Sequence, residues 1–185
     1  MAFDAEWRKR CVVKRCSICD VDQFVKAHYL AKRPAIVLLC LVVECDGSAI
    51  GFVTYSSPPI STEVRYGCVV WELSRLYLLD NIPMNAESWL ISKSVRWVKR
   101  CHKDVGLLVS YADPSVGHSG TIYKAANWQF DGMTDAGRKS PRCDYVDLNT
   151  GKKYGRLGNM PRDSVVVRVP RVSKSRFILR IRKNV

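Results

Sequence analysis

The sequence predicts an α+β fold in which a mixed β-sheet is flanked by helices, and three observations support it. Three strand-like apolar runs follow one another, as in an antiparallel meander. A helical segment then separates the third run from a fourth, which is typical of a parallel crossover. The chain has 185 residues, 47% of them hydrophobic, which is enough for one domain with an ample core. We therefore expect residues 1–185 to form a single domain.

The individual elements follow from periodicity and turn signals. A first helix is expected over 20–29, where Asp20 is a good N-cap and the apolar side chains share one side. Cys-Asp-Gly-Ser at 45–48 is a strong hairpin signal between two strands. The remaining pattern predicts strands over 35–44, 49–55, 68–79, 105–110, 128–132 and 177–182, and helices over 85–98 and 119–127.

Eight cysteines are scattered through these segments, and reduced, buried thiols are the expected state. Cys16 and Cys19 form a CxxC close to Cys11, but no second CxxC or HxxxH follows, so packing is favoured over a zinc site. The apolar stretch over 35–43 is too short to span a bilayer, and the amino-terminal residues do not make a signal peptide. These features predict a cytoplasmic protein without a membrane partner.

The charge is strongly basic and unevenly distributed. Thirty Lys and Arg against seventeen Asp and Glu give a formal charge of +13, and Asp163 is the one acid after residue 150. A basic segment with few acids is typical of nucleic-acid binding, because neutralised phosphates release counterions. We therefore expect residues 151–185 to contribute to DNA binding; the alternative is a solvated basic face. The cations predicted to contact DNA are Arg171, Lys174, Arg176, Arg180 and Arg182.

Polar residues crowd into the segment over 111–128, directly after the predicted strand over 105–110. Asp113 and Tyr123 flank this strand-to-helix junction, which is where ligands usually sit in open α/β sheets. His118 and Tyr111 are secondary candidates in the same loop. The alternative is that Asp113 caps a turn before Pro114 and that Tyr123 is a core residue.

The order of elements resembles that of the GNAT acetyltransferases. This resemblance implies an acyl-CoA pyrophosphate at the amino end of the helix over 85–98, with the backbone amides of Glu87 and Ser88 as candidate anion-binding groups. The segment over 79–88 departs from the family pattern, because it contains no glycine that would let the backbone approach a pyrophosphate closely.

A closer resemblance covers most of the chain. The motifs Ala-His-Tyr at 27–29, Glu-Leu-Ser-Arg-Leu at 72–76 and Pro-Met-Asn-Ala-Glu-Ser-Trp at 83–89, together with the loop over 111–128, resemble the Mom family of phage DNA-modification proteins in order and spacing. The resemblance implies a GNAT-like enzyme that places a carbamoylmethyl group on adenine N6 in double-stranded DNA and so blocks restriction. The family's functional residues correspond to His28, Arg75, Asp113 and Tyr123.

The chemistry of these four residues leaves two readings open. A carbamoylmethyl product is joined through its CH₂ carbon, so ordinary attack on a carbonyl cannot form it. His28, Asp113 and Tyr123 could ligate iron, which suits one nitrogen and two oxygens. Alternatively, Asp113 serves as base and Tyr123 as acid, while Arg75 orients a carboxylate or phosphate. Structural roles are a further alternative, with His28 in the core and Arg75 paired to Glu72 or Asp113.

A base flipped out of duplex DNA needs aromatic surfaces on which to stack. Tyr29, Tyr111, Trp89 and Trp128 are available, although Trp128 is better placed for core packing. Two other function classes stay open: an acetyl-CoA-dependent N-acetyltransferase, and a non-catalytic basic DNA-binding module. The sequence leaves the group donor and the oligomeric state undetermined.

Overall fold

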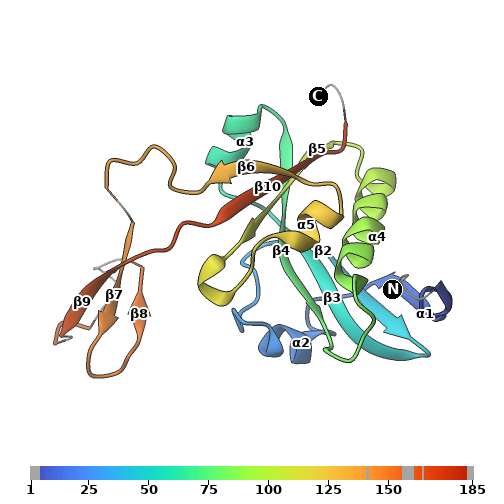
Figure 1. Cartoon of the computed structure of the whole chain (residues 1–185), viewed down its shortest axis with the longest axis horizontal. Helices are drawn as coiled ribbons and strands as arrows, with labels where there is room; N and C mark the ends of the chain where they lie inside the picture. Colours follow the sequence, from blue (N-terminus) through green and yellow to red (C-terminus); the bar gives the residue numbers. More distant parts are fainter. Residues whose placement is uncertain (1–4, 141, 156–160, 164, 183–185) are drawn as a thin grey trace.

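The structure, a computed structural model, describes residues 5–140, 142–155, 161–163 and 165–182. Its centre is a seven-stranded sheet in the order β1-β2-β3-β4-β5-β10-β6 (Figure 1). Every adjacent pair is antiparallel except β4 and β5, which are parallel. The strands are β1 Cys11–Arg15, β2 Val37–Cys45, β3 Ser48–Ser56, β4 Val69–Leu78, β5 Val105–Ala112, β6 Gln129–Met133 and β10 Ser175–Arg180.

Helices cover both faces of this sheet. The long α4 (Ala86–Cys101) packs on one face together with α1 (Ala5–Arg10) and α5 (Thr121–Ala125), and α2 (Asp22–Ala27) and α3 (Ile60–Tyr66) lie on the other. Successive side chains of β2 point to opposite faces of the sheet. Leu39, Leu41 and Val43 enter the α4 side, whereas Cys40 and Val42 pack against α2.

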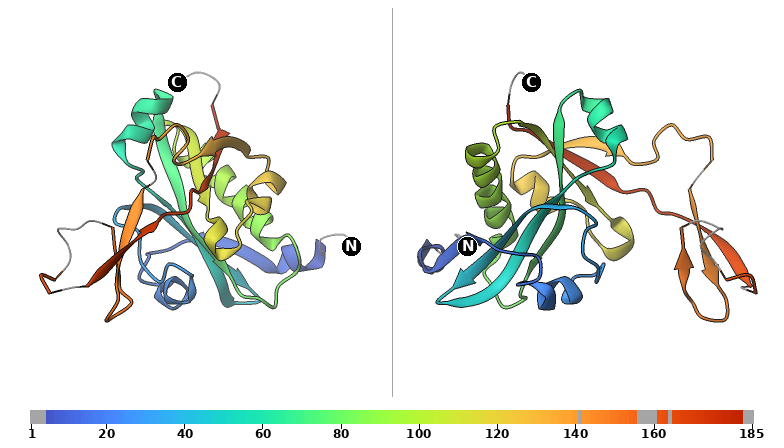
Figure 2. Two further views of the ribbon diagram at one scale, coloured as in Figure 1. Left: turned by 60° about the vertical axis from the view of Figure 1, so that its left-hand side comes forward. Right: turned by 180° about the vertical axis from the view of Figure 1, so that it is seen from behind.

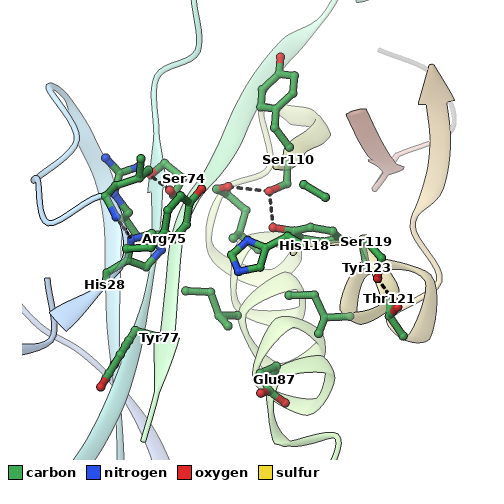
Figure 3. A pocket seen from close by; sticks show the side chains of 18 of the residues that line it. His28, Ser74, Arg75, Tyr77, Glu87, Ser110, His118, Ser119, Thr121 and Tyr123 are labelled. Atoms are coloured by element: carbon green, nitrogen blue, oxygen red, sulfur yellow. Dashed lines mark hydrogen bonds between the residues drawn. The ribbon is translucent and has the colours of Figure 1, made fainter. Parts of the chain in front are cut away.

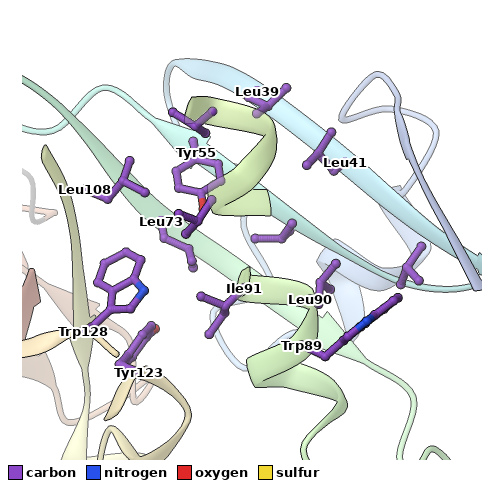
Figure 4. Close-up of a cluster of buried hydrophobic side chains, with 14 of the residues drawn as sticks. Leu39, Leu41, Tyr55, Leu73, Trp89, Leu90, Ile91, Leu108, Tyr123 and Trp128 are labelled. Carbon is purple, nitrogen blue, oxygen red and sulfur yellow. The ribbon is translucent and has the colours of Figure 1, made fainter. Parts of the chain in front are cut away.

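The core on the α4 side is large and aromatic (Figure 4). Leu90 and Ile91 of α4 are fully buried against the sheet. The buried Tyr55 keeps its hydroxyl partnered, because it lies 2.7 Å from the Ser94 hydroxyl of α4. Trp128 is a core residue, 4% exposed, as the sequence predicted. Within the described residues, no helix has the length and the hydrophobicity needed to cross a membrane.

The parallel pair β4–β5 separates before either strand ends. Their pairing runs from Val69 and Val105 to Glu72 and Val109 and then stops. Beyond this point β4 continues along β3 to Leu78, while β5 continues along β10 to Ala112. The two strands therefore open a gap in the middle of the sheet, and the candidate site lies there.

A second, three-stranded sheet stands apart from the first (Figure 2). It pairs β8 (Lys153–Tyr154), β7 (Cys143–Asp147) and β9 (Val166–Pro170) in an antiparallel arrangement. β9 is largely exposed, including Val167 and Val169. After this second sheet, the chain returns to the main sheet, where β10 lies between β5 and β6.

Most predicted elements are present, with several differences. Sequence reasoning did not predict β1, α3 or the second sheet. Asp20 does not cap α2; its carboxylate accepts the Ser17 amide in the preceding turn, and Val21 is the N-cap residue. The eight cysteines are unbridged, but Cys19 and Cys101 are exposed rather than buried. Cys16 instead contacts Cys40 on β2, with 3.4 Å between the two sulfurs.

Gly120, which precedes α5, offers a test of how tightly this region is packed. Its φ is +80°, and a Cβ would lie 2.2 Å from the Phe177 ring. Gly117 has a φ of +79° with nothing within 4 Å of its Cβ position. Gly120→Ala should therefore lower the free energy of unfolding by about 1–3 kcal/mol more than Gly117→Ala, because only the former adds overpacking to the backbone strain. Urea unfolding of both variants measures this difference, and equal losses would contradict the packing argument.

Candidate active site

A cavity of about 490 Å³ occupies the gap between β4 and β5. Its walls come from β4, from the end of β5, from the loop before α5 and from the segment after α2. Figure 3 shows His28 and Arg75 on one side, with Ser110, His118 and Tyr123 on the other. Residues far apart in the sequence, from His28 to Lys174, thus line the same cavity. Three of the four main predicted site residues are among them: His28, Arg75 and Tyr123.

Ser110 links the two separated strands. Its hydroxyl lies 2.8 Å from the Leu73 carbonyl oxygen of β4 and 2.8 Å from the Tyr123 hydroxyl (Figure 3). A carbonyl can only accept, and a serine has one proton, so when that proton goes to Leu73 the Tyr123 hydroxyl donates to Ser110. Ser110 thereby gives a partner to a backbone carbonyl next to the gap and orients the phenol of Tyr123.

Tyr123 is held rigidly and stays protonated. Its ring stacks on Phe177 and lies close to Trp128, and its side chain is buried. Burial raises the pKa of Tyr123 to about 12. At neutral pH the hydroxyl is therefore neutral. Its one proton becomes available to a ligand when Ser110 turns its own proton from Leu73 to the Tyr123 oxygen.

Glu72 is the carboxylate at the point where β4 and β5 part. Burial raises the pKa of Glu72 above its usual range, and the positive charges of Arg75 and Lys174 offset part of this rise. Within the described part of the chain, no group donates a hydrogen bond to it. A half-buried carboxylate with a raised pKa that lines a cavity has the properties of a general base.

His28 is buried and neutral. Burial, followed by the nearby Arg75 and His118, lowers the pKa of His28 to about 4. Its Nδ1 accepts a hydrogen bond from the Leu30 amide at 3.1 Å, which places the ring proton on Nε2. His28 is therefore suited to donate a hydrogen bond, not to carry a charge.

Arg75 holds the segment after α2 against β4. Its Nε donates to the Lys32 carbonyl at 3.0 Å and its Nη1 to the Ser74 carbonyl at 2.6 Å. Two of its donors are thus committed to backbone groups, and the bidentate ligand role expected from the sequence must use those that remain. Arg75 lies near Glu72, but it does not form the ion pair with Glu72 or Asp113 that was the alternative.

The two secondary candidates also line the cavity, together with Tyr29. The Tyr29 ring lies between two imidazoles, with its centroid 4.5 Å from His28 and 5.0 Å from His118. Tyr29 is 43% exposed, so one part of an aromatic surface remains open to a ligand. Both His28 and His118 face the cavity, a point that spacing alone could not decide.

Asp113 does not line the cavity. Its carboxylate lies 2.8 Å from the Lys174 ammonium and accepts hydrogen bonds from the Ser115 amide and hydroxyl. Burial acts to raise the pKa of Asp113, but these hydrogen bonds outweigh it and keep the pKa below its usual range. Asp113 is therefore a weak base that caps the turn before Pro114 and places Lys174 in the cavity wall.

The basic residues predicted to bind DNA are mostly engaged within the chain. Arg171 pairs with Asp144, and Arg176 pairs with Asp131. Arg182 donates to the Lys99 and His102 carbonyls at the end of α4, so it caps that helix. Arg180 is exposed. DNA contact by the residues after 150 stays a prediction, and residues 156–160, 164 and 183–185 lie outside the described residues.

The donor set for iron does not come together. His28 and Tyr123 line the cavity, whereas the Asp113 carboxylate is occupied by Lys174 and Ser115. The raised pKa of Tyr123 also opposes the phenolate that a metal would require. Among the described residues, no group of three or more His, Cys, Asp and Glu could hold a metal ion. The arrangement thus does not fit the iron hypothesis.

The amino end of α4 fits a pyrophosphate poorly. The first bond of the helix runs from the Trp89 amide to the Asn85 carbonyl, so the amides of Glu87 and Ser88 lie ahead of it and have no partner within the helix. However, the Asp80 and Glu87 side chains line the cavity at this end, where they would repel an anion. No step below uses coenzyme A.

Sequence reasoning missed Glu72 as a functional residue, and it missed Ser74, Ser110 and Lys174 as cavity residues. Glu72 could have been found, because its polar side chain interrupts an apolar strand. The cavity position of Lys174 depends on β10 reaching β5, which no local pattern reveals.

Comparison with known proteins gives a consistent result. A family model described as the Mom protein family matches residues 11–165. A 65-residue segment is 36% identical to methylcarbamoylase Mom of Escherichia phage Mu, covering 35% of this chain and 27% of that protein. The matched segment thus spans about a quarter of the relative's length.

Solved structures share the fold. Spermidine N-acetyltransferase from Vibrio cholerae, in complex with CoA and spermine, superposes with a TM-score of 0.54 at 8% identity, covering 93% of this chain and 96% of that one. Ribosomal-protein-S5-alanine acetyltransferase from Vibrio fischeri gives a TM-score of 0.56 at 11% identity, covering 92% and 93%. The chain therefore has the fold of the GNAT acetyltransferases, as the order of its elements predicted.

The lowered pKa of His28 predicts a pH-dependent stability. The unfolded chain takes up a proton at this histidine as the pH falls below 6.5, whereas the folded protein does so only near 4. The stabilisation is therefore complete above pH 6.5 and is lost as the pH falls to 4, by up to about 3 kcal/mol. His28→Gln should remove this part of the pH dependence, as measured by urea unfolding at several pH values. Identical slopes for variant and wild type would contradict the assignment.

Proposed function

The chain belongs to the Mom protein family, and on that premise we propose that it transfers a carbamoylmethyl group to the N6 amine of adenine in DNA. The relative in phage Mu is named as a methylcarbamoylase. The observation that carries the proposal is a pair of titratable groups in one cavity, the Glu72 carboxylate and the protonated Tyr123 hydroxyl, whose pKa values are both raised by burial. Modified adenines would protect the DNA of the encoding phage from restriction.

The proposed reaction forms one bond and breaks one. The adenine N6 attacks the CH₂ carbon of a donor that carries a leaving group on that carbon. The N6 proton passes to Glu72, and the bond between the CH₂ carbon and the leaving group breaks with its electron pair on the leaving group. Tyr123 gives its proton to the leaving group, and exchange with solvent restores both residues. The donor is thus a small molecule activated at its α-carbon.

The other cavity residues position the substrates. The exposed part of the Tyr29 ring offers a stacking surface for a flipped adenine. The Nε2–H of neutral His28 and the remaining donors of Arg75 can bind carbonyl or anionic groups of the donor. Asp113 acts through Lys174 and is a positioning residue.

An acetyl-CoA-dependent N-acetyltransferase is a second candidate, because the shared fold includes a neighbour solved with CoA. The carboxylates of Asp80 and Glu87 at the amino end of α4 disfavour this activity, because they would repel the pyrophosphate of CoA. A non-catalytic DNA-binding module is a weaker third candidate, since a cavity with tuned acid and base groups has no role in it. Mass spectrometry separates all three, because a carbamoylmethyl-adenine, an acetylated product and unmodified DNA differ in mass.

The test is to express the chain in bacteria with a plasmid, digest the DNA to nucleosides and measure the modified adenine. Glu72→Gln and Tyr123→Phe should each lower its rate of formation by about 10²–10⁴-fold, because each removes one proton-transfer group. Asp113→Asn should have a smaller effect, since Asp113 acts only through Lys174.

Glu87→Gln is the matched control, because it removes another carboxylate from the cavity wall and should retain modification. Equal losses in Glu72→Gln and Glu87→Gln would contradict the base role of Glu72. Unmodified DNA from folded wild-type protein would refute the proposed reaction.

A further inference from the structure

A second groove lies outside the cavity, between α4 and the edge strand β1. It has a volume of about 520 Å³. Val12 and Val13 of β1 form one wall, and α4 contributes Trp97 to the other. Three cations of α4 also line it: Lys93, Arg96 and Arg100. None of the residues that line this groove is acidic.

The three cations form one row on α4. Their spacing of three and four residues places them on the same face of the helix. The row is two turns or about 10 Å long, which is the axial length of about three phosphate-to-phosphate steps of one DNA strand. Lys93 and Arg96 lie in the middle of α4, so favourable interaction with the helix dipole does not explain them.

These cations differ from those of the carboxy-terminal segment, because no acid of the described residues forms an ion pair with them. Among the described residues, the ion pairs take up other cations, including Lys174, Arg171 and Arg176. Lys93 lies 5.6 Å from the centre of the Trp89 ring, and Arg100 lies 5.6 Å from that of Trp97. Arg96 donates its Nε to the Ser92 carbonyl and keeps its terminal nitrogens free. The side chains are thus held in place by aromatic rings and backbone, with their charge available to a partner.

From this arrangement we infer that the α4–β1 groove binds the sugar-phosphate backbone of DNA. Unpaired cations attract phosphates, and the valines and indole edge provide an apolar surface for sugars. The groove begins at Trp89, two residues after Glu87 of the cavity, so one helix serves both places. The proposed adenine chemistry makes DNA the expected nucleic acid, and the inference rests on it to that extent.

The test compares two triple variants that lose the same charge. One replaces Lys93, Arg96 and Arg100 by Gln, and the matched control replaces Lys26, Arg65 and Lys139, which are exposed cations of other elements. Binding of a fluorescent 20-base-pair duplex is measured by anisotropy between 50 and 300 mM salt, using the full chain. All six side chains are at the surface or groove rim, and thermal unfolding verifies that each variant is folded.

The groove variant should bind the duplex at least about 10-fold more weakly at 100 mM salt, with a salt slope reduced by about 2 to 3. The control should lose less than about 3-fold and keep its slope, because only phosphate contacts release counterions. The single variants Lys93→Gln and Arg96→Gln should each lower the slope by about 1. Wild-type affinity and slope in the groove variant, or equal losses in both triple variants, would overturn the inference.

Two further arms separate this inference from the proposed reaction. Glu72→Gln should keep wild-type DNA affinity, so a failure of catalysis leaves the binding result interpretable. An RNA of the same sequence should bind more weakly than the DNA; tighter RNA binding that depends on Lys93 and Arg96 would overturn the assignment to DNA.

Discussion

The loss of pairing between β4 and β5 after Glu72 and Val109 is the constraint on which the rest of the structure depends. Two strands that part within a sheet leave backbone groups without their usual partners, and a buried carbonyl without a partner is costly. Side chains replace the missing bonds here. Ser110 donates to the Leu73 carbonyl across the gap, and Arg75 donates to the carbonyl of Ser74, where the register of β3 and β4 shifts. The gap is therefore maintained by the residues that also form the cavity wall.

The same side chains thus support the backbone and line the cavity, and this explains which of them are free to react with a ligand. Groups that bond the backbone, such as Arg75, have little freedom to move toward a ligand. Side chains that make no such bond remain available to a ligand. Glu72 has a raised pKa, and part of the Tyr29 ring is exposed. Burial keeps His28 neutral and Tyr123 protonated. The fold thus separates positioning from proton transfer among neighbouring residues, which is a common property of preorganised sites.

Local patterns were sufficient to predict most strands of the main sheet and the parallel crossover between β4 and β5, because strands with alternating or continuous apolar character and a long amphipathic helix carry strong signals. They did not reveal β1 or the place of β10 between β5 and β6. Local patterns did not predict the elements whose side chains are mostly exposed. α3 exposes Ile60 and Val64, so it has no apolar face to recognise, and β9 is similarly exposed. Three of the four main predicted site residues line the cavity, whereas Glu72 was missed. Asp113 was placed at the strand end, but its pairing with Lys174, far along the chain, has no local sequence signal.

The position of β10 sets the order in which a new chain can assemble. β10 lies between β5 and β6, yet a ribosome synthesises it after every other strand of the main sheet. Until residues 175–180 emerge, β5 presents an open edge, and Tyr123 lacks the Phe177 ring on which it stacks. A nascent chain without residues 175–180 therefore has a sheet divided in two and a Tyr123 side chain that lacks its stacking partner. The unpaired edge of β5 makes chains that stall or end before β10 prone to aggregation.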